Sequence, residues 1–171
     1  MKIIDGFLQP AELIALRDGM LSSGFPWQCV PILSSGASPD MAASENLQWV
    51  HGFVHWQSRK LYRSPALPML EAVADRLGPV RLLRVKANLT RPLDRHLEYG
   101  LHVDVRRPGA STGILYLNDN NGYTVFEDGT RVQSAANRFV EFDASLRHTG
   151  ASCTDAPYRL VLNLNWLGAK D

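Results

Sequence analysis

The C-terminal half of the chain is a succession of short strand-like segments separated by turn residues, and this pattern restricts the fold more than any other feature. Apolar and polar side chains alternate in short runs, and Asp128-Gly129 between two of the runs is a strong signal for a β-hairpin. Seven such segments in roughly 90 residues indicate a sandwich, barrel or jelly roll, not a parallel sheet built from βαβ units. The predicted strands are Val80–Leu89, Gly100–Val105, Gly113–Asn118, Tyr123–Glu127, Thr130–Gln133, Arg138–Phe142 and Tyr158–Trp166.

Two segments before residue 80 carry helical signals. Residues 10–22 place Pro10 in a first turn, and apolar side chains recur there at helical spacing. This apolar stripe consists of Leu13, Ile14, Leu16 and Met20. Residues 64–77 have proline in their first turns and end at Gly78-Pro79, which stops a helix. We therefore expect a mainly β fold in which two N-terminal helices cover one face of the β core.

A predicted loop and a predicted strand lie between these helices. Residues 31–46 are rich in Ser, Gly, Pro and Ala, so we expect a long loop that is either a lid over a binding site or disordered. Residues 49–56 alternate with a period of two, which predicts a strand. His51 and His55 share one face of it, and we interpret them as core or pocket-wall residues because no carboxylate accompanies them.

Length and composition fit one ordinary globular domain. The chain has 171 residues, of which 45% are hydrophobic and 20% are charged, enough for a single core. We predict one domain over residues 1–171, with a helical and lid region at 1–79 and a β core at 80–168.

The same composition argues against several classes of protein. A net charge of +1 gives no electrostatic footprint for nucleic acid or an anionic membrane, and no apolar run approaches the roughly 20 residues that cross a bilayer. The first residues lack the apolar region of a secretion signal, and two cysteines form no disulfide framework. We expect a cytoplasmic protein that binds neither nucleic acid nor membrane; the sequence indicates no oligomeric state.

The spacing of two histidines and one aspartate points to a metal site. Side chains two residues apart in extended backbone project to the same side, so His102 and Asp104 can offer a nitrogen and an oxygen to one point. If a second strand brings His148 to that point, the three groups occupy one face of a metal ion, a set that suits iron(II) and leaves about three positions open. Taken alone, the spacing also fits a surface histidine beside a solvated aspartate. The neighbouring strands therefore decide between the two interpretations.

The last predicted strand has one apolar and one polar face. Its apolar face, which must be buried, consists of Leu160, Leu162 and Leu164. Arg159 begins the opposite face and is expected to point into the cavity of the candidate ligands. A buried guanidinium requires an anionic partner, and its planar fork suits a carboxylate. That partner is either a bound ligand or an internal acid, Glu141 or Asp143.

Two further polar side chains lie on strands that can line the same cavity. Asn88 lies in a run where polar and apolar residues alternate, and Tyr116 faces opposite to Leu115 and Leu117. Both can hydrogen-bond a bound carboxylate. The alternatives are a core tyrosine with a satisfied hydroxyl and a strand-end asparagine.

The order of these residues resembles the iron(II)/2-oxoglutarate-dependent oxygenase family, in particular its prolyl 4-hydroxylase-like branch and its small phage- and bacterial-type members. The resemblance runs from about Arg84 to Trp166 and rests on His102-x-Asp104, His148 and Arg159. Three further segments also resemble the family: Gly113–Asp119, Gly122–Phe126 and Phe142–His148.

The resemblance implies a double-stranded β-helix (jelly-roll, cupin-like) core, Fe(II) as metal, 2-oxoglutarate as co-substrate and O2 as oxidant, with ascorbate as a candidate stimulant. It implies that the iron ligands and catalytic residues are His102, Asp104 and His148. It also implies that the residues binding 2-oxoglutarate are Arg159 for the far carboxylate, Tyr116 as its helper, and Asn88 for the near carboxylate. An aspartate at 104, where a small residue would admit a halide, favours hydroxylation over halogenation.

The chain departs from the family pattern at two places outside the ligand set. Asn120-Asn121-Gly122-Tyr123 stands where many relatives have two glycines, and residues 133–138 replace a stretch rich in Pro and Gly. We expect these changes to affect substrate and loop shape more than metal chemistry.

We therefore predict a dioxygenase that hydroxylates a small molecule or peptide, such as a peptidyl proline or another amino-acid side chain, and releases succinate and CO2. One alternative is a cupin-like metal or small-ligand binding module without 2-oxoglutarate turnover, although cupins usually pair His-x-His with a following Glu. Another is a β-sandwich without activity that binds proteins. Arg106 and Arg107 either favour an acidic or peptide target or are simply solvated.

Overall fold

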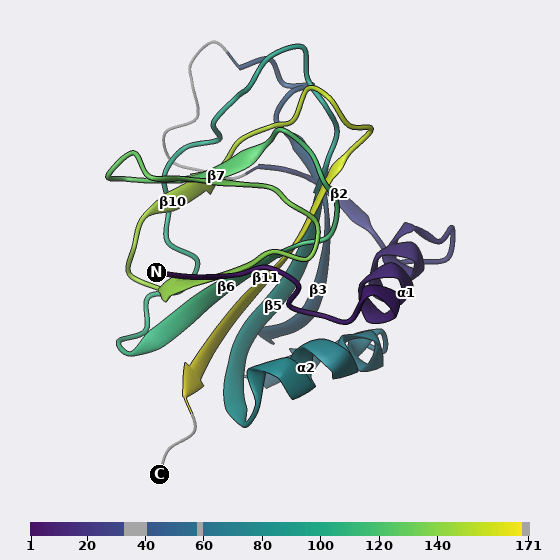
Figure 1. Cartoon of the computed structure of the whole chain (residues 1–171), viewed down its shortest axis with the longest axis vertical. Helices are drawn as coiled ribbons and strands as arrows, with labels where there is room; N and C mark the ends of the chain where they lie inside the picture. The colour runs from purple at the N-terminus through teal and green to yellow at the C-terminus, as the bar shows by residue number, and fades with distance from the viewer. Residues whose placement is uncertain (33–40, 58–59, 169–171) are drawn as a thin grey trace.

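Two antiparallel sheets of unequal size form the body of the protein (Figure 1). The computed structural model describes residues 1–32, 41–57 and 60–168. The large sheet has, in spatial order, β1 (Lys2–Ile4), β9 (Phe139–Asp143), β6 (Ala110–Tyr116), β11 (Arg159–Gly168), β5 (Val80–Thr90), β3 (Leu47–Gln57) and β2 (Gln28–Pro31), with β4 (Lys60–Arg63) paired to β3. The small sheet consists of β10 (His148–Gly150), β7 (Tyr123–Phe126) and β8 (Arg131–Gln133).

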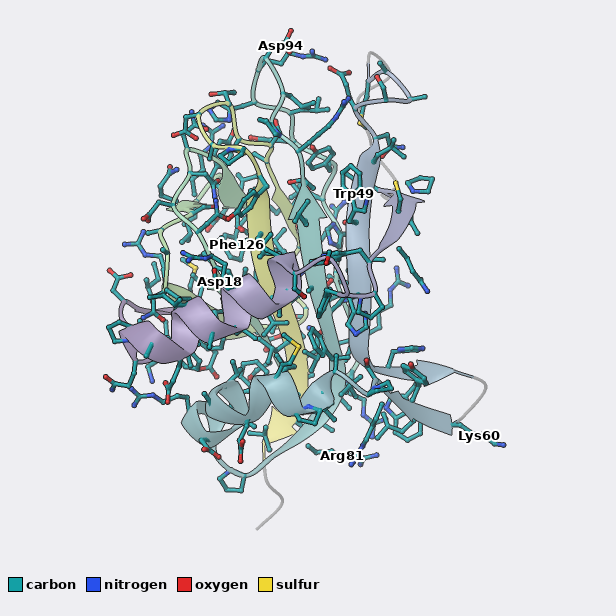
Figure 2. All side chains as sticks on the ribbon, turned by 90° about the vertical axis from the view of Figure 1, so that its right-hand side faces the viewer. Asp18, Trp49, Lys60, Arg81, Asp94 and Phe126 are labelled. Atoms are coloured by element: carbon teal, nitrogen blue, oxygen red, sulfur yellow. The ribbon has the colours of Figure 1, made fainter. Side chains whose placement is uncertain are left out.

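The helices α1 (Pro10–Leu21) and α2 (Glu71–Leu77), the latter preceded by a 3-10 turn at Leu67–Leu70, pack against one face of the large sheet (Figures 1 and 2). The core between them is apolar because alternate residues of β11 and β5 point toward the helices. Leu160, Leu162 and Leu164 are all buried there, as predicted. The mainly β architecture with helices on one face is therefore confirmed. None of the described helices is both long and apolar enough to cross a bilayer.

The details of α1 differ from the prediction at one residue. Leu13, Leu16 and Met20 are buried, but Ile14 is 48% exposed. The apolar stripe is thus narrower than predicted, because one side of the helix faces solvent.

The predicted strand Gly100–Val105 is wrong. This segment makes only an isolated bridge, in which His102 and His148 exchange two backbone hydrogen bonds of 2.9 and 3.0 Å. A second isolated bridge, between Glu98 and Ala151, lies just before this segment, so the two backbones run side by side without forming a continuous ladder. The backbone is nevertheless held where the prediction required it, opposite His148.

Four short strands were not predicted: β1, β2, β4 and β10. Each has at most four residues, too few for a period of two to stand out. The partner of β1 is β9, more than 130 residues away, whereas β4 pairs with β3, the strand directly before it. Residues 1–79 thus contribute strands to the large sheet as well as its helical cover.

The predicted strand around residue 50 forms β3, with a bulge near Phe53 that the alternation did not predict. The bulge buries two successive residues, Phe53 and Val54. His51 is a satisfied core histidine, because its two ring nitrogens contact Pro26 O at 3.0 Å and Ser64 Oγ at 2.9 Å. Half of the predicted loop 31–46, namely residues 33–40, lies outside the described residues.

Candidate functional site

A polar cavity of about 310 Å³ lies between the two sheets. The large sheet contributes β3, β5, β6 and β11, and the small sheet contributes β7 and β10. Along β5, the side chains on the cavity face alternate with the core residues Val85 and Ala87. This face consists of Arg84, Lys86, Asn88 and Thr90. A strand with one apolar and one polar face therefore forms the wall between the core and the cavity.

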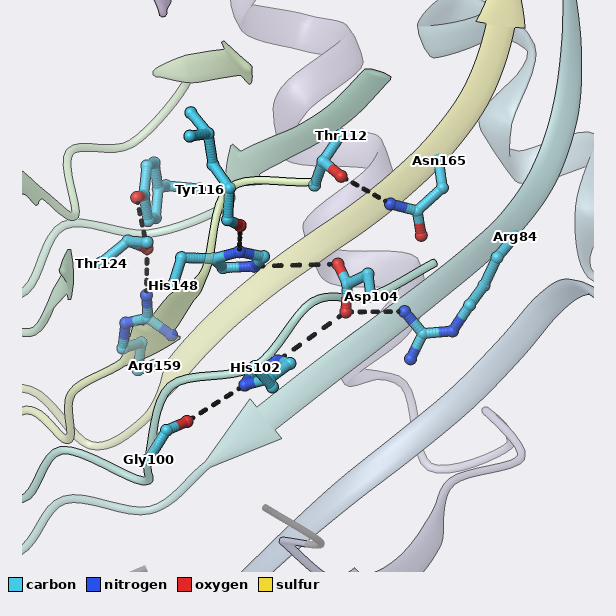
Figure 3. Close-up of polar contacts among 11 residues, drawn as sticks. Arg84, Gly100, His102, Asp104, Thr112, Tyr116, Thr124, His148, Arg159 and Asn165 are labelled. Carbon is cyan, nitrogen blue, oxygen red and sulfur yellow. Dashed lines mark hydrogen bonds and ion pairs between the residues drawn. The ribbon is translucent and has the colours of Figure 1, made fainter. Parts of the chain in front are cut away.

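His102, Asp104 and His148 meet at one side of this cavity (Figure 3). One side-chain donor atom of each lies within 4.8 Å of the others. His102 Nε2 lies 3.8 Å from Asp104 Oδ1, and His148 Nε2 lies 3.8 Å from Asp104 Oδ2. The three side chains come together because the bridge between residues 102 and 148 aligns the two backbones.

The remaining ring nitrogens are bound in the same way in both histidines. Nδ1 of His102 contacts Gly100 O at 3.1 Å, and Nδ1 of His148 contacts Leu146 O at 3.1 Å. A carbonyl can only accept, so each Nδ1 carries the proton and each Nε2 presents its lone pair. Asp104 Oδ2 is buried and has no hydrogen-bond partner. Two free imidazole lone pairs and an unpaired carboxylate oxygen fit a divalent metal ion, iron(II) in particular.

Charges around Asp104 favour its ionised form. Arg84 Nη1 donates to Asp104 Oδ1 at 3.0 Å. Burial by itself raises the pKa of Asp104, but the charges of Arg84, His148, His102 and Lys86 outweigh burial and lower it below its usual value. Burial also lowers the pKa of His148 below its ordinary 6.5, and burial lowers that of Lys86 to about 8. A carboxylate and a neutral imidazole are the forms that bind metal.

Arg159 is the first residue of β11 and lines the same cavity. Its side chain is buried, with 7% of the residue exposed. Nε donates to Ser134 Oγ at 3.0 Å, and Nη2 contacts Tyr123 O and Thr124 Oγ1, both at 3.4 Å. All these acceptors are neutral, so burial lowers the pKa of the guanidinium. Among the described residues, Arg159 has no carboxylate partner.

The internal ion pair considered for Arg159 does not form. Glu141 and Asp143 both lie on β9, and β6 separates β9 from β11 in the sheet. Asp143 instead accepts hydrogen bonds from the backbone and hydroxyl of Ser145. The positive charge of Arg159 therefore faces the cavity without an internal counter-ion, an arrangement that suits an anionic ligand.

Comparison with solved structures identifies the fold. A 2OG-Fe(II) oxygenase family oxidoreductase from Burkholderia pseudomallei is 18% identical, with a TM-score of 0.59 over 90% of this chain and 79% of that one. A prolyl-4-hydroxylase from Pseudomonas putida is 16% identical, with a TM-score of 0.60 over 99% and 92%. The non-heme alpha-ketoglutarate-dependent carbocyclase SnoK from nogalamycin biosynthesis is 15% identical, with a TM-score of 0.63 over 98% and 79%.

This chain has the 2OG-Fe(II) oxygenase fold. The double-stranded β-helix predicted from the resemblance is thereby confirmed. No family model matches the sequence, and no curated protein matches it either. The likeness is thus carried by the tertiary structure, at sequence identities of 14–18% among the structures compared.

Of the two remaining predicted residues, Asn88 lines the cavity and Tyr116 lies behind its wall. The buried Oδ1 of Asn88 has no hydrogen-bond partner. Tyr116 is buried behind the cavity wall, where its hydroxyl donates to Thr124 Oγ1 at 2.7 Å (Figure 3). Its ring lies 5.6 Å from the Arg159 guanidinium carbon. Tyr116 therefore contacts the cavity through Thr124, which lies between the tyrosine and the arginine.

Sequence reasoning did not identify several cavity residues. Arg84 and Lys86 share the alternation that singled out Asn88, so the same signal could have identified them. Thr124 and Ser134 hold Arg159 but carry no distinctive spacing. Tyr99, whose pKa is raised to about 12 by burial, also lines the cavity.

Gly122 leaves room for the side chain of Arg159. A Cβ on Gly122 would lie 2.7 Å from Asn120 Oδ1 and 2.8 Å from Arg159 Cδ, so both side chains would have to move. Gly122 is the glycine retained in the altered Asn120–Tyr123 turn. The turn that departs from the family pattern thus still admits the arginine.

Proposed function

We propose that this protein is an Fe(II)- and 2-oxoglutarate-dependent dioxygenase that hydroxylates a peptide or small molecule. One observation carries the proposal. One cavity is lined by His102, Asp104 and His148, each of which presents a free atom that can bind a metal. The same cavity is lined by Arg159, whose guanidinium has no carboxylate partner among the described residues. The donors suit iron(II), and the guanidinium suits the distal carboxylate of a dicarboxylate co-substrate.

In this proposal, His102 Nε2, His148 Nε2 and Asp104 Oδ2 hold the iron on one face. The hydrogen bonds from both Nδ1 atoms keep the imidazoles in the tautomer that binds metal. Arg84 holds the other oxygen of Asp104 and keeps the carboxylate ionised. Bound iron with 2-oxoglutarate would supply the activation of O2, with release of succinate and CO2.

Arg159 would orient the co-substrate by pairing with its far carboxylate. Ser134 and Thr124 fix the guanidinium, and Tyr116 fixes Thr124. We assign the near carboxylate to Asn88, whose unpaired side chain lines the cavity. Thr90 and Asn163 also present buried unpaired oxygens there, which a bound polar ligand or water would satisfy.

The reaction we assign is hydroxylation, and a peptidyl proline or another amino-acid side chain is one substrate class. Support comes from fold neighbours that are prolyl hydroxylases, from Pseudomonas putida and from a chlorella virus. Because both cysteines, Cys29 and Cys153, are free, a reducing compartment such as the cytoplasm fits the protein.

Anaerobic absorption spectroscopy tests the proposal. Addition of Fe(II) and then 2-oxoglutarate to the purified protein should produce a weak visible charge-transfer band, and the His148→Ala variant should lose it. His96→Ala, at a histidine outside the cavity that contacts Ser152 O, should keep the band. In air, the wild type should release succinate. Metal binding without the band or succinate would instead support a cupin-like binding module.

Arg159→Lys separates the co-substrate site from the metal site. Lysine keeps the charge but loses the planar fork, so 2-oxoglutarate should bind about 10- to 100-fold more weakly, because one hydrogen bond to a charged carboxylate is lost. Fe(II) affinity measured by calorimetry should stay unchanged. Arg131→Lys, on an exposed arginine paired with Glu98, is the matched control.

A further inference from the structure

A second hollow, of about 500 Å³, adjoins the cavity of the candidate metal site. We call it the arginine groove. It lies between the end of β3, the start of β5 and the loop that follows Asp104. Its polar and aromatic lining residues are His55, Trp56, Arg81, Arg84, Arg106 and Arg107. Within the described ranges, no acidic residue contributes to this lining.

A β-bulge brings two of the arginines to the same face of β5. The pairing of β5 with β11 shifts register between Arg84 and Leu82, so that Leu83 is the extra residue. Leu82 on one side of the bulge and Val85 on the other both pack into the apolar core. Arg81 and Arg84, three residues apart, are therefore both on the opposite face and line the groove.

The groove carries positive charge that the described part of the chain does not neutralise. Arg81, Arg106 and Arg107 are exposed and form no ion pair with any described acidic residue. Figure 2 shows Arg81 at the same end of the molecule as the β3–β4 hairpin, near whose tip lies Lys60. A concave surface lined by charge of one sign concentrates the field and attracts a counter-ion.

Arg84 connects the arginine groove to the metal site. Its guanidinium donates to Asp104 Oδ1, its side chain is 27% exposed, and the residue lines both hollows. An anion bound in the groove could thus contact Arg84, whose guanidinium also binds the candidate metal ligand Asp104. The inner cavity of about 310 Å³ has to hold 2-oxoglutarate, so a prime substrate would extend outward from it.

We infer that the prime substrate is a compact phosphate-bearing molecule whose phosphate binds in the arginine groove. This inference rests on the proposed dioxygenase function. Guanidinium forks match the oxygens of phosphate, and several forks around one hollow suit a group that accepts hydrogen bonds on more than two oxygens. Trp56, which is 49% exposed, offers an aromatic face to the rest of the molecule. The net charge of the whole chain is only +1, so the positive charge is local and suits a small anion better than a long polyanion.

Calorimetry with four probes tests this inference. The probes are glucose 6-phosphate, adenosine monophosphate, hexaglutamate and a 16-nucleotide single-stranded DNA. The wild type should bind both monophosphates, and the double variant Arg106→Gln/Arg107→Gln should bind them at least about tenfold more weakly, because two charge-assisted contacts are lost. The control Arg17→Gln/Arg131→Gln makes the same change of net charge on arginines that pair with acids outside the groove, and should bind like wild type.

Four results would overturn the inference: no binding of either monophosphate, equal weakening in both double variants, tighter binding of hexaglutamate than of the monophosphates, or binding of the DNA about 100-fold tighter than both. The anaerobic charge-transfer band, recorded on the same samples, reports on the proposed function separately. The band should persist in Arg106→Gln/Arg107→Gln, since neither residue contacts the candidate ligands. A missing band in the wild type would contradict the dioxygenase function, whereas the calorimetry would still show whether the groove binds a phosphate.

Discussion

Arg84 donates from Nη1 to Oδ1 of Asp104 at 3.0 Å, and this contact leaves Oδ2 as the unpaired oxygen of the carboxylate. Oδ2 lies 3.8 Å from His148 Nε2, on the side where a metal would bind. The guanidinium therefore orients a candidate iron ligand and at the same time lowers the pKa of Asp104. Such a partner of a ligand commonly tunes metal affinity.

Arg84→Gln should weaken Fe(II) binding about 10- to 100-fold without unfolding the protein, since it removes this orienting contact. Anaerobic calorimetry with Fe(II) measures the effect, and circular dichroism checks the fold. Arg81→Gln, at the next arginine on the same face of β5, has no contact with Asp104 and should retain the wild-type affinity. Equal losses in the two variants would mean that Arg84 acts only through the general positive field.

Gly122→Ala should weaken 2-oxoglutarate binding about 10- to 100-fold, because the added methyl group displaces Arg159 and small displacements of a binding group are costly. Fe(II) affinity should not change, since the turn does not touch the metal ligands. Gly24→Ala is the matched control, because a Cβ there meets no atom within 4 Å. Titration of the charge-transfer band with 2-oxoglutarate gives its affinity, and anaerobic calorimetry gives that of Fe(II). An unaltered 2-oxoglutarate affinity in Gly122→Ala would show that Arg159 tolerates the shift.

The metal-free protein should lose stability as the pH falls through 6.5, the ordinary pKa of histidine. Burial lowers the pKa of His148 in the folded state, so below 6.5 the unfolded chain binds a proton that the folded chain does not. The free energy of unfolding therefore decreases on acidification until the pH reaches the folded pKa. Thermal unfolding with a chelator, between about pH 7.5 and pH 5.5, measures this slope.

His148→Asn provides the comparison for this pH dependence. Asparagine does not titrate, so the slope of stability against pH between about 7.5 and 5.5 should be shallower in the variant. Asp104 contributes at a lower pH than His148. Its pKa is lower in the folded than in the unfolded state, so the ionised carboxylate stabilises the fold, and this contribution disappears only in strong acid. Identical slopes in wild type and variant would assign the effect to other groups.

Leu162→Ala should lower the free energy of unfolding by about 2–5 kcal/mol, since it opens a cavity between β11 and the helices. Leu162 is completely buried in that core. Leu146→Ala, at a leucine that is 45% exposed, should change stability by no more than about 0.5 kcal/mol. Chemical denaturation of both variants measures the difference, and a small loss for Leu162→Ala would contradict the packing of β11.

The alternation of residues along the chain was sufficient to predict most long strands and the composition of the core. Leu160, Leu162 and Leu164 must share a face whatever the fold, because side chains of a strand alternate. The same rule brought out Asn88, and could have brought out Arg84 and Lys86. The His102-x-Asp104 spacing likewise points to convergent side chains before any tertiary structure is known.

Tertiary structure alone decided which distant residues meet. Segments that no local pattern connects meet at the bridge between His102 and His148 and at the contact from Arg84 to Asp104. The same holds for the neutral side chains that surround Arg159. The bulge at Leu83, which places Arg81 and Arg84 together, also appears only when β5 pairs with β11. Local preferences act over a few neighbouring residues, whereas strand register and ion pairing depend on the partner that the folded chain supplies. The sequence therefore determined the chemical groups and their faces, and folding determined their partners.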